Sequence, residues 1–150
     1  MEKNIEDFYE VIGIVYDSVK DLKINWHLNG SFNLIVHGLN VKVKDLDIET
    51  DEKGLRLFRE KLKDFLQEDK YKKDIKAHSL LFDIEGVEVE VLAHDNPELA
   101  MINQFSIANV DDMKIPVLPL DKARKFYKII GKNDKAELID KHLKLFNEMF

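Results

Sequence analysis

The chain has 150 residues, with 23 Lys and Arg against 29 Asp and Glu, and it contains no Cys. This length suits one ordinary domain with a substantial core, so we expect a single domain over residues 1–150, with a core over about 1–94 and a helical part over about 95–150. The lack of Cys excludes a disulfide scaffold, a thiolate zinc site and a cysteine nucleophile. The net charge of −6 argues against extended nucleic-acid binding and against attachment to an anionic membrane.

No segment has the pattern of a membrane span or of a secretory leader. The longest apolar run, Val11–Tyr16, is far shorter than the roughly 20 residues that cross a bilayer. Residues 1–7 are acidic and lack the apolar stretch of a signal peptide. We therefore expect a soluble, cytoplasmic protein.

The N-terminal quarter predicts a helix, a strand and a short second helix. Apolar residues recur every three or four positions from Ile5 to Leu22, which indicates an amphipathic helix with Asn4 as its cap. Residues 23–28 alternate between polar and apolar, which predicts a half-buried strand. A glycine-containing turn then leads into a short buried helix over residues 32–36.

Three aromatic residues around this segment are expected to be structural rather than chemical. Trp26 is predicted to lie in the core, and His37 is predicted to cap the short helix, which Gly38 ends. His27 shares the polar face of its strand, so it can border a cleft on that side.

The middle of the chain predicts a strand, a helix and a hairpin. The alternation of Val41–Lys44 is out of phase with the residues that follow, so we expect a loop there and a strand that begins near Asp45. Thr50 is predicted to cap a helix carrying four apolar residues, Leu55, Phe58, Leu62 and Phe65. A polar loop through Lys70 and Asp74 should follow.

Two strands, over residues 79–84 and 87–92, are then predicted to form a hairpin at Glu85-Gly86. Residues 95–113 give no clear pattern. Residues 115–119 contain two prolines and are expected to be an extended connector rather than a central strand. Two helices over 120–130 and 133–149 should complete a mixed α/β fold, and the second should turn Leu138, His142, Phe146 and Met149 inward.

Three features carry the candidate chemistry. Gly30-Ser31 lies between a strand and a helix, where backbone N–H groups and the Ser31 hydroxyl can bind a phosphate. Asp45 and Asp47 lie two apart on a strand, so both carboxylates project from one face and together suit Mg²⁺. Glu88 and Glu90, on a later strand, offer a third carboxylate. This set is what a two-metal phosphoryl-transfer site requires.

Each feature alone is common, but their order and spacing resemble a known pattern. An apolar strand with Gly30-Ser31, then a gap of residues 32–44, then Asp45-Leu46-Asp47-Ile48 is similar to the signature of the nucleotidyltransferase superfamily. That superfamily includes DNA polymerase β, the kanamycin and lincosamide nucleotidyltransferases and the minimal nucleotidyltransferases. Further similarity to small bacterial and archaeal members covers nearly the whole chain; it lies at Trp26, His37-Gly38, Thr50–Gly54, Met113–Leu118, Lys128 and Gly131.

The resemblance implies a role for each of these positions. Gly30 and Ser31 would hold the phosphates of the nucleotide, and Asp45 and Asp47 would bind metal. Glu90 stands where the small members carry the third catalytic and metal-binding carboxylate, although Glu88 shares its face and stays a rival. Lys128 would neutralise triphosphate charge. The Gly-Arg that follows this helix in the family is Gly131-Lys132 here, so a bidentate arginine contact is missing.

The implied activity is transfer of a nucleoside monophosphate from a nucleoside triphosphate with Mg²⁺ (or Mn²⁺) to an acceptor hydroxyl, with release of pyrophosphate. The acceptor can be a small molecule, a protein side chain or an RNA end. The alternative is a non-catalytic nucleotide- or partner-binding module, such as a toxin–antitoxin component, because few residues remain to build an acceptor pocket. A homodimer would supply one. A template-dependent polymerase is disfavoured by the acidic balance.

Overall fold

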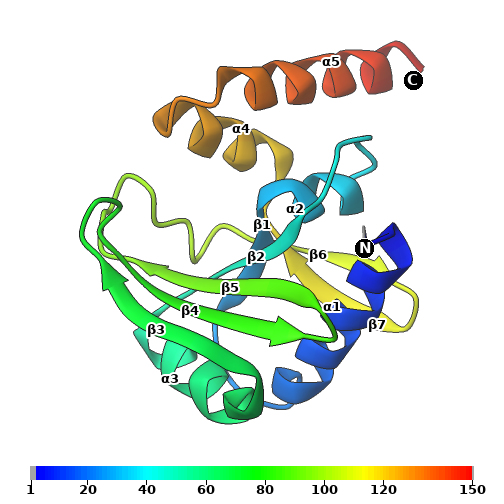
Figure 1. Cartoon of the computed structure of the whole chain (residues 1–150). Coiled ribbons are helices and arrows are strands. Elements are labelled where there is room, and N and C mark those ends of the chain that lie inside the picture. The colour runs from blue at the N-terminus through cyan, green and yellow to red at the C-terminus, as the bar shows by residue number, and fades with distance from the viewer. Residues whose placement is uncertain (1–2, 150) are drawn as a thin grey trace.

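The computed structural model describes residues 3–149, and its centre is a mixed seven-stranded sheet in the order β3-β4-β5-β2-β1-β7-β6 (Figure 1). The strands are β1 Trp26–Asn29, β2 Asp45–Thr50, β3 Leu66–Lys72, β4 Ala77–Ile84, β5 Val87–His94, β6 Ser106–Val110 and β7 Met113–Val117. The helices are α1 Ile5–Val19, α2 Gly30–Val36, α3 Glu52–Lys61, the 3₁₀ turn η1 Lys63–Phe65, α4 Leu120–Ile129 and α5 Asn133–Met149. The mixed α/β class predicted from the sequence is confirmed.

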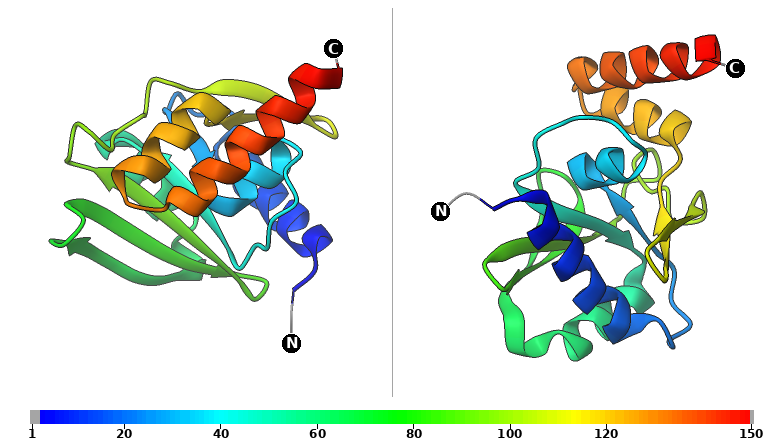
Figure 2. Two further views of the ribbon diagram at one scale, coloured as in Figure 1. Left: turned by 90° about the horizontal axis from the view of Figure 1, so that it is seen from above. Right: turned by 90° about the vertical axis from the view of Figure 1, so that its right-hand side faces the viewer.

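The helices form two layers, one on each face of the sheet. Helices α1 and α3 cover one face, where the main core lies around Phe8, Phe58 and Phe82. Helices α4 and α5 lie side by side above the other face, next to α2 (Figure 2). A separate apolar cluster, including Leu34, Tyr127 and Ile139, holds this second layer together. No helix among residues 3–149 combines the length and apolar character that a bilayer crossing requires.

The first two helices follow the sequence prediction closely. Asn4 caps α1, and Asp7 completes a capping box by accepting the Asn4 backbone N–H at 3.0 Å. Trp26 is buried, as expected. His37 ends α2 and donates from Nε2 to the Leu118 carbonyl at 2.8 Å, so its capping role is confirmed and it also ties α2 to the chain before α4.

Helix α3 is capped by Asp51 and not by Thr50. The Asp51 Oδ1 atom accepts the Gly54 N–H at 2.8 Å, whereas the Thr50 hydroxyl donates to the Asn25 carbonyl at 2.6 Å. The prediction was wrong by one residue because β2 continues through Thr50. The helix also ends at Lys61, so Phe65 belongs to the 3₁₀ turn that follows.

We expect Asp51→Ala to destabilise the protein by about 1 kcal/mol, the usual effect of removing an N-cap. For a chain of this size that corresponds to a fall in Tm of about 2–4 °C, measurable by thermal unfolding. Asp121→Ala is the matched control, because Asp121 lies in the first turn of α4 without capping it. An equal fall in both variants would contradict the capping role.

The loop predicted through Lys70 is instead the edge strand β3. Its residues are mostly exposed on both faces, so they show no apolar alternation. Backbone pairing with β4 in an antiparallel register, Tyr71 opposite His78, holds the strand in place. Charged residues on both faces are typical of edge strands, which must not pair with other chains.

The proline-containing segment at residues 115–119 was expected to be a connector, but most of it belongs to β7. Pro116 lies opposite Ile107 of β6, and the parallel pairing with β1 is confined to Leu28 and Val117. Pro116 has no backbone N–H to donate. This is tolerated because β7 pairs with β1 at one residue pair only, so few hydrogen bonds could form on that side of the strand. Residues 106–117 join the sheet, so the helical part begins at Leu120 and not near residue 95.

The hairpin was predicted correctly, with Glu85 and Gly86 both at positive φ (52° and 82°), as a tight two-residue turn requires.

The inward face of α5 was predicted wrongly. The helix buries Ala136 and Ile139, whereas Leu138 and Met149 are 39% and 77% exposed. Both sets of residues repeat at helical spacing, so periodicity could not choose between them.

Candidate active site

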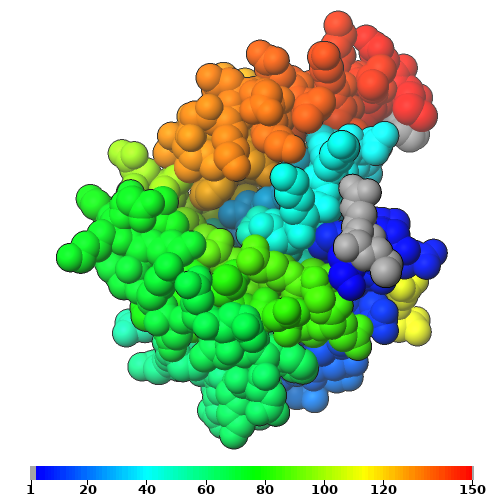
Figure 3. All heavy atoms as spheres, in the orientation of Figure 1, coloured from blue at the N-terminus to red at the C-terminus, as the bar shows by residue number. Residues whose placement is uncertain are grey.

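Strand pairing brings the predicted carboxylates together. In the sheet Asp47 lies opposite Glu90 of β5 on one side and opposite Asn29 of β1 on the other. Asp45 and Asp47 share a face because they are two residues apart. Asp45, Asp47 and Glu90 line a pocket of about 340 Å³ together with Gly30 and Ser31. Figure 3 shows the surface recessed between the α4–α5 layer and the strands below it.

The first residue of α2, Gly30, lies in close contact with the Asp47 carboxylate. Gly30 has a φ of +66°, and a Cβ placed on it would collide with the Asp47 carboxylate. Its N–H donates to the Asn29 side chain at 2.9 Å. The glycine is therefore required both by its backbone conformation and by the close approach of Asp47.

Burial and repulsion from neighbouring carboxylates raise the pKa values of Asp45 and Asp47. Burial, and then the charges of Asp45 and Glu90, raise the pKa of Asp47 to about 7. Burial and the charge of Glu90 also raise the pKa of Asp45, which Lys132 and Lys44 partly oppose. Such a cluster is stabilised when a cation enters it.

The donor set fits a hard divalent cation. Asp45 and Asp47 supply neighbouring carboxylate oxygens, which Mg²⁺ prefers together with water and phosphate oxygens. Among residues 3–149 no three His, Asp or Glu side chains are already gathered closely enough to hold a metal ion. Asp45 and Asp47 would hold it first, and Glu90 is the nearest third donor in the sheet register.

The structure favours Glu90 over Glu88 as the third carboxylate. Glu90 lines the pocket, whereas Glu88 is exposed and lies outside it. One oxygen of Glu90, Oε2, accepts hydrogen bonds from Lys72 Nζ and from Ser79 Oγ, each at 2.8 Å. The hydrogen bond with Glu90 raises the pKa of Lys72.

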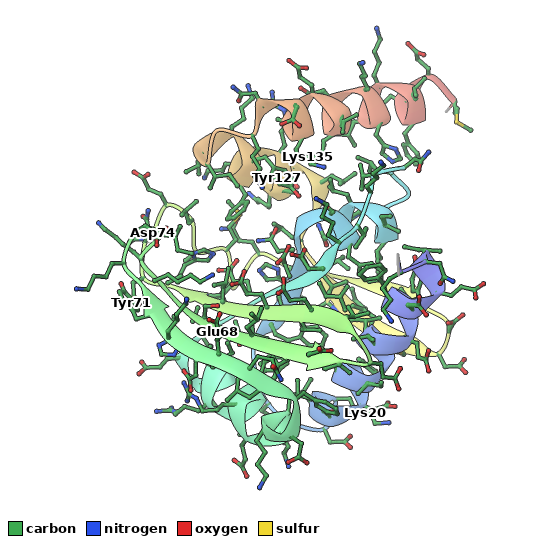
Figure 4. The ribbon with its side chains drawn as sticks, in the orientation of Figure 1. Lys20, Glu68, Tyr71, Asp74, Tyr127 and Lys135 are labelled. Atoms are coloured by element: carbon green, nitrogen blue, oxygen red, sulfur yellow. The ribbon has the colours of Figure 1, made fainter. Side chains whose placement is uncertain are left out.

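The roof of the pocket comes from the C-terminal helices. Tyr127 of α4 and Lys135 of α5 lie on the underside of this layer, facing the sheet (Figure 4), and Lys132 lies between the two helices. Burial and then the charge of Asp47 raise the pKa of the Tyr127 hydroxyl. Lys128, predicted from the resemblance, is exposed and does not line the pocket.

Sequence reasoning therefore missed Lys132 and Lys135 as the pocket's cations. A signal for Lys132 was present, since it occupies the position of the arginine in the family's Gly-Arg pair. Lys135 had no such signal, because its place depends on which side of α5 faces the sheet.

A second cavity of about 500 Å³ adjoins the first, and Glu49 and His94 line both. Burial lowers the pKa of His94, and its buried Nδ1 atom has no hydrogen-bond partner among residues 3–149. His27 does not border the pocket as predicted. It is fully buried, with Nε2 3.2 Å from Oε1 of Glu49, and so it lies behind the residue that lines both cavities.

Comparison with known proteins shows the family to which this chain is related. Residues 11–143 match the family model of the aminoglycoside-2″-adenylyltransferases. The chain belongs to this family. Its membership confirms the nucleotidyltransferase resemblance and relates the chain to adenylyltransferases. A comparison with curated protein sequences gave no match.

Three solved structures share the fold of this family member. A Thermotoga maritima protein assigned as a nucleotidyltransferase is 26% identical, with a TM-score of 0.77 over 95% of this chain and 96% of that one. The lincosamide antibiotic adenylyltransferase LnuA, solved with lincomycin, is 15% identical, with a TM-score of 0.62 over 93% and 98%. ANT(2″)-Ia, solved with adenylyl-2″-tobramycin, is 8% identical, with a TM-score of 0.56 over 93% and 99%.

Proposed function

We propose that this chain transfers a nucleoside monophosphate from a Mg²⁺-bound nucleoside triphosphate to a hydroxyl group of a small acceptor. The observation that carries the proposal is the pocket in which Asp45, Asp47 and Glu90 face Lys132 and Lys135. Carboxylates for metal on one wall and ammonium groups for phosphate on another are what a triphosphate donor needs.

The residues of the pocket fall into three groups, each with its own task in this reaction. Asp45, Asp47 and Glu90 would hold Mg²⁺, which when bound lowers the pKa of an attacking hydroxyl and neutralises charge on the transferred phosphoryl group. Gly30 and Ser31 would bind donor phosphates, and Lys132 and Lys135 would balance their charge. The acceptor hydroxyl gives its proton to water as its oxygen attacks the α-phosphorus, the bond from that phosphorus to the α,β-bridging oxygen breaks, and pyrophosphate leaves with the electron pair of that bond.

The family supports a proposal for the donor, and the second cavity supports a proposal for the class of acceptor. The family description and two structural relatives are adenylyltransferases, which supports ATP as the donor. The adjoining cavity of about 500 Å³ has the size of a small-molecule site. It supports a small acceptor over a protein side chain or an RNA end, and it supports an acceptor site built from one chain.

The first test is thermal unfolding with ATP, GTP, CTP and UTP, each with and without Mg²⁺. We expect ATP with Mg²⁺ at about 100 times its Kd to stabilise the protein by roughly 2.7 kcal/mol, which raises Tm by about 5–10 °C. Release of pyrophosphate, measured with small hydroxyl compounds such as lincomycin and tobramycin added as acceptors and with water as the background acceptor, then separates an enzyme from a non-catalytic binding module. No shift with any nucleotide, or a shift without pyrophosphate release, would contradict the proposal.

A further inference from the structure

The third carboxylate is held by two residues from strands that do not line the carboxylate pocket. Lys72 lies on β3 and Ser79 on β4, and both bind the same oxygen of Glu90, Oε2, at 2.8 Å. Side-chain exposure is 31% for Lys72 and 20% for Glu90, so water competes only partly for this pair. A charged hydrogen bond and a neutral one together fix the direction of the carboxylate.

This arrangement leaves the two oxygens of Glu90 in different situations. The Oε1 atom accepts no hydrogen bond from the part of the chain that the structure describes, residues 3–149. Since Glu90 lines the pocket beside Asp45 and Asp47, Oε1 is the oxygen left for a ligand there. A side chain with three rotatable bonds would otherwise have to be ordered by the ligand itself, at a cost in conformational entropy.

The neighbouring lysine shows that the contact is specific to one position of β3. Lys70 lies two residues before Lys72, on the same face of the strand, but it contacts Glu68 at 3.6 Å and not the site. The two lysines have the same charge and lie on the same face of β3, but the Lys70 side chain is 54% exposed against 31% for Lys72, and Lys70 does not contact Glu90.

We propose that Lys72 and Ser79 are positioning residues that hold Glu90 through Oε2, so that Oε1 is presented to the metal as a third ligand oxygen. Lys72 also supplies the positive charge that offsets one of three crowded carboxylates while no metal is bound. This inference rests on the proposed function, because it assigns the supporting shell of the same site. Such outer contacts commonly affect metal affinity or activity by 10–100-fold.

The test uses Ser79→Ala, which changes no charge, and Lys72→Met, with Lys72→Arg as the conservative variant and Lys70→Met as the matched control. Calorimetric titration of the nucleotide-free protein with Mn²⁺ measures metal affinity, and pyrophosphate release from Mg²⁺-ATP, in the presence of the acceptor that gives turnover with the wild type, gives kcat and KM. We expect Ser79→Ala to weaken Mn²⁺ binding by roughly 10-fold, and both Ser79→Ala and Lys72→Met to lower kcat by at least about 10-fold.

The KM for ATP should stay the same in these variants, because the phosphates are held by other residues. Lys72→Arg should keep most of the activity, and Lys70→Met should match the wild type. Unchanged Mn²⁺ affinity in Ser79→Ala, or values of kcat in both variants equal to that of Lys70→Met, would overturn the inference. The far-ultraviolet circular dichroism of each variant checks its fold, and Ser79→Ala decides alone if Lys72→Met does not fold.

Failure of the proposed function gives a different result. A wild type that neither binds Mn²⁺ nor releases pyrophosphate would overturn both proposals. A wild type that does both, with Asp47→Asn losing both and the Lys72 and Ser79 variants losing neither, would overturn the positioning role alone.

Discussion

Replacing Asp47 with Asn should abolish pyrophosphate release, with a loss of at least about 1,000-fold, and should also make the protein more stable. Asp47 is the central carboxylate of the pocket, flanked in the sheet by Asn29 and Glu90. Loss of a charged metal ligand removes several kcal/mol of transition-state stabilisation, and each 1.36 kcal/mol is a factor of ten in rate. The measurement is kcat/KM with saturating Mg²⁺.

The gain in stability follows from linkage. The folded pKa of Asp47 is about 7, above its ordinary value of 3.8. The folded protein therefore keeps a proton that the unfolded chain releases, so the contribution of Asp47 to stability falls as pH rises from about 4 to 7 and stays constant above that. Asn has no such proton, so its advantage over the wild type grows across this window and reaches about 2–4 kcal/mol at pH 8 without metal.

Thermal unfolding at pH 5 and pH 8, with and without Mg²⁺, tests this expectation. Metal should raise the Tm of the wild type at pH 8 and leave Asp47→Asn unchanged, because the cation offsets the repulsion that the substitution removes. Ser18→Ala is a suitable control for unfolding, since Ser18 lies on α1 away from the pocket and donates only to the Ile14 carbonyl. An Asp47→Asn protein that unfolds, or that keeps its turnover, would contradict the assigned role.

Gly30→Ala should lower kcat/KM by about 100-fold or more and destabilise the protein by about 2–3 kcal/mol. An L-residue at a φ of +66° costs roughly 1–2 kcal/mol by itself. The added Cβ also meets the Asp47 carboxylate, so Asp47 must move away from Asp45 and Glu90. A small displacement of a metal ligand has a large effect on rate because the site depends on fixed geometry.

Gly38→Ala separates these two effects. Gly38 also has a positive φ, 97°, but a Cβ there would lie 3.6 Å from His142, an ordinary contact distance. We expect Gly38→Ala to lose stability and keep its activity. If Gly30→Ala lost no more activity than Gly38→Ala, the close approach between Gly30 and Asp47 would have no role in catalysis.

The carboxylates on the strands, Asp45, Asp47 and Glu90, could be brought together from the sequence, whereas the arrangement of the roof formed by α4 and α5 could not. Asp45 and Asp47 share a face by the period of a strand, and the parallel register then places Glu90 beside them. These relations are local or depend on one strand pairing. The positions of Lys132 and Lys135 depend on how α4 and α5 sit above the sheet, which no local pattern encodes.

The same distinction explains the errors in the fold. Helix α5 carries two stripes at helical spacing, one with Ala136 and Ile139 and one with Leu138 and Met149, and the sequence predicted that the second faces inward. The structure buries Ala136 and Ile139, and Ile139 packs in one apolar cluster with Ala123 and Tyr127 of α4. Strand β3 was missed because an edge strand exposed on both faces needs no apolar pattern.

The two layers of the fold have separate apolar cores, and this has a consequence for how the family can diversify. The carboxylates lie on strands anchored in the main core, whereas the roof of the pocket rests on its own cluster around Leu34, Tyr127 and Ile139. Substitutions at distant sites with no shared partners have nearly additive effects. Substitutions inside the cluster of the roof should therefore add to substitutions inside the main core in their effects on the free energy of unfolding, so each layer can change its packing residues without a matching change in the other.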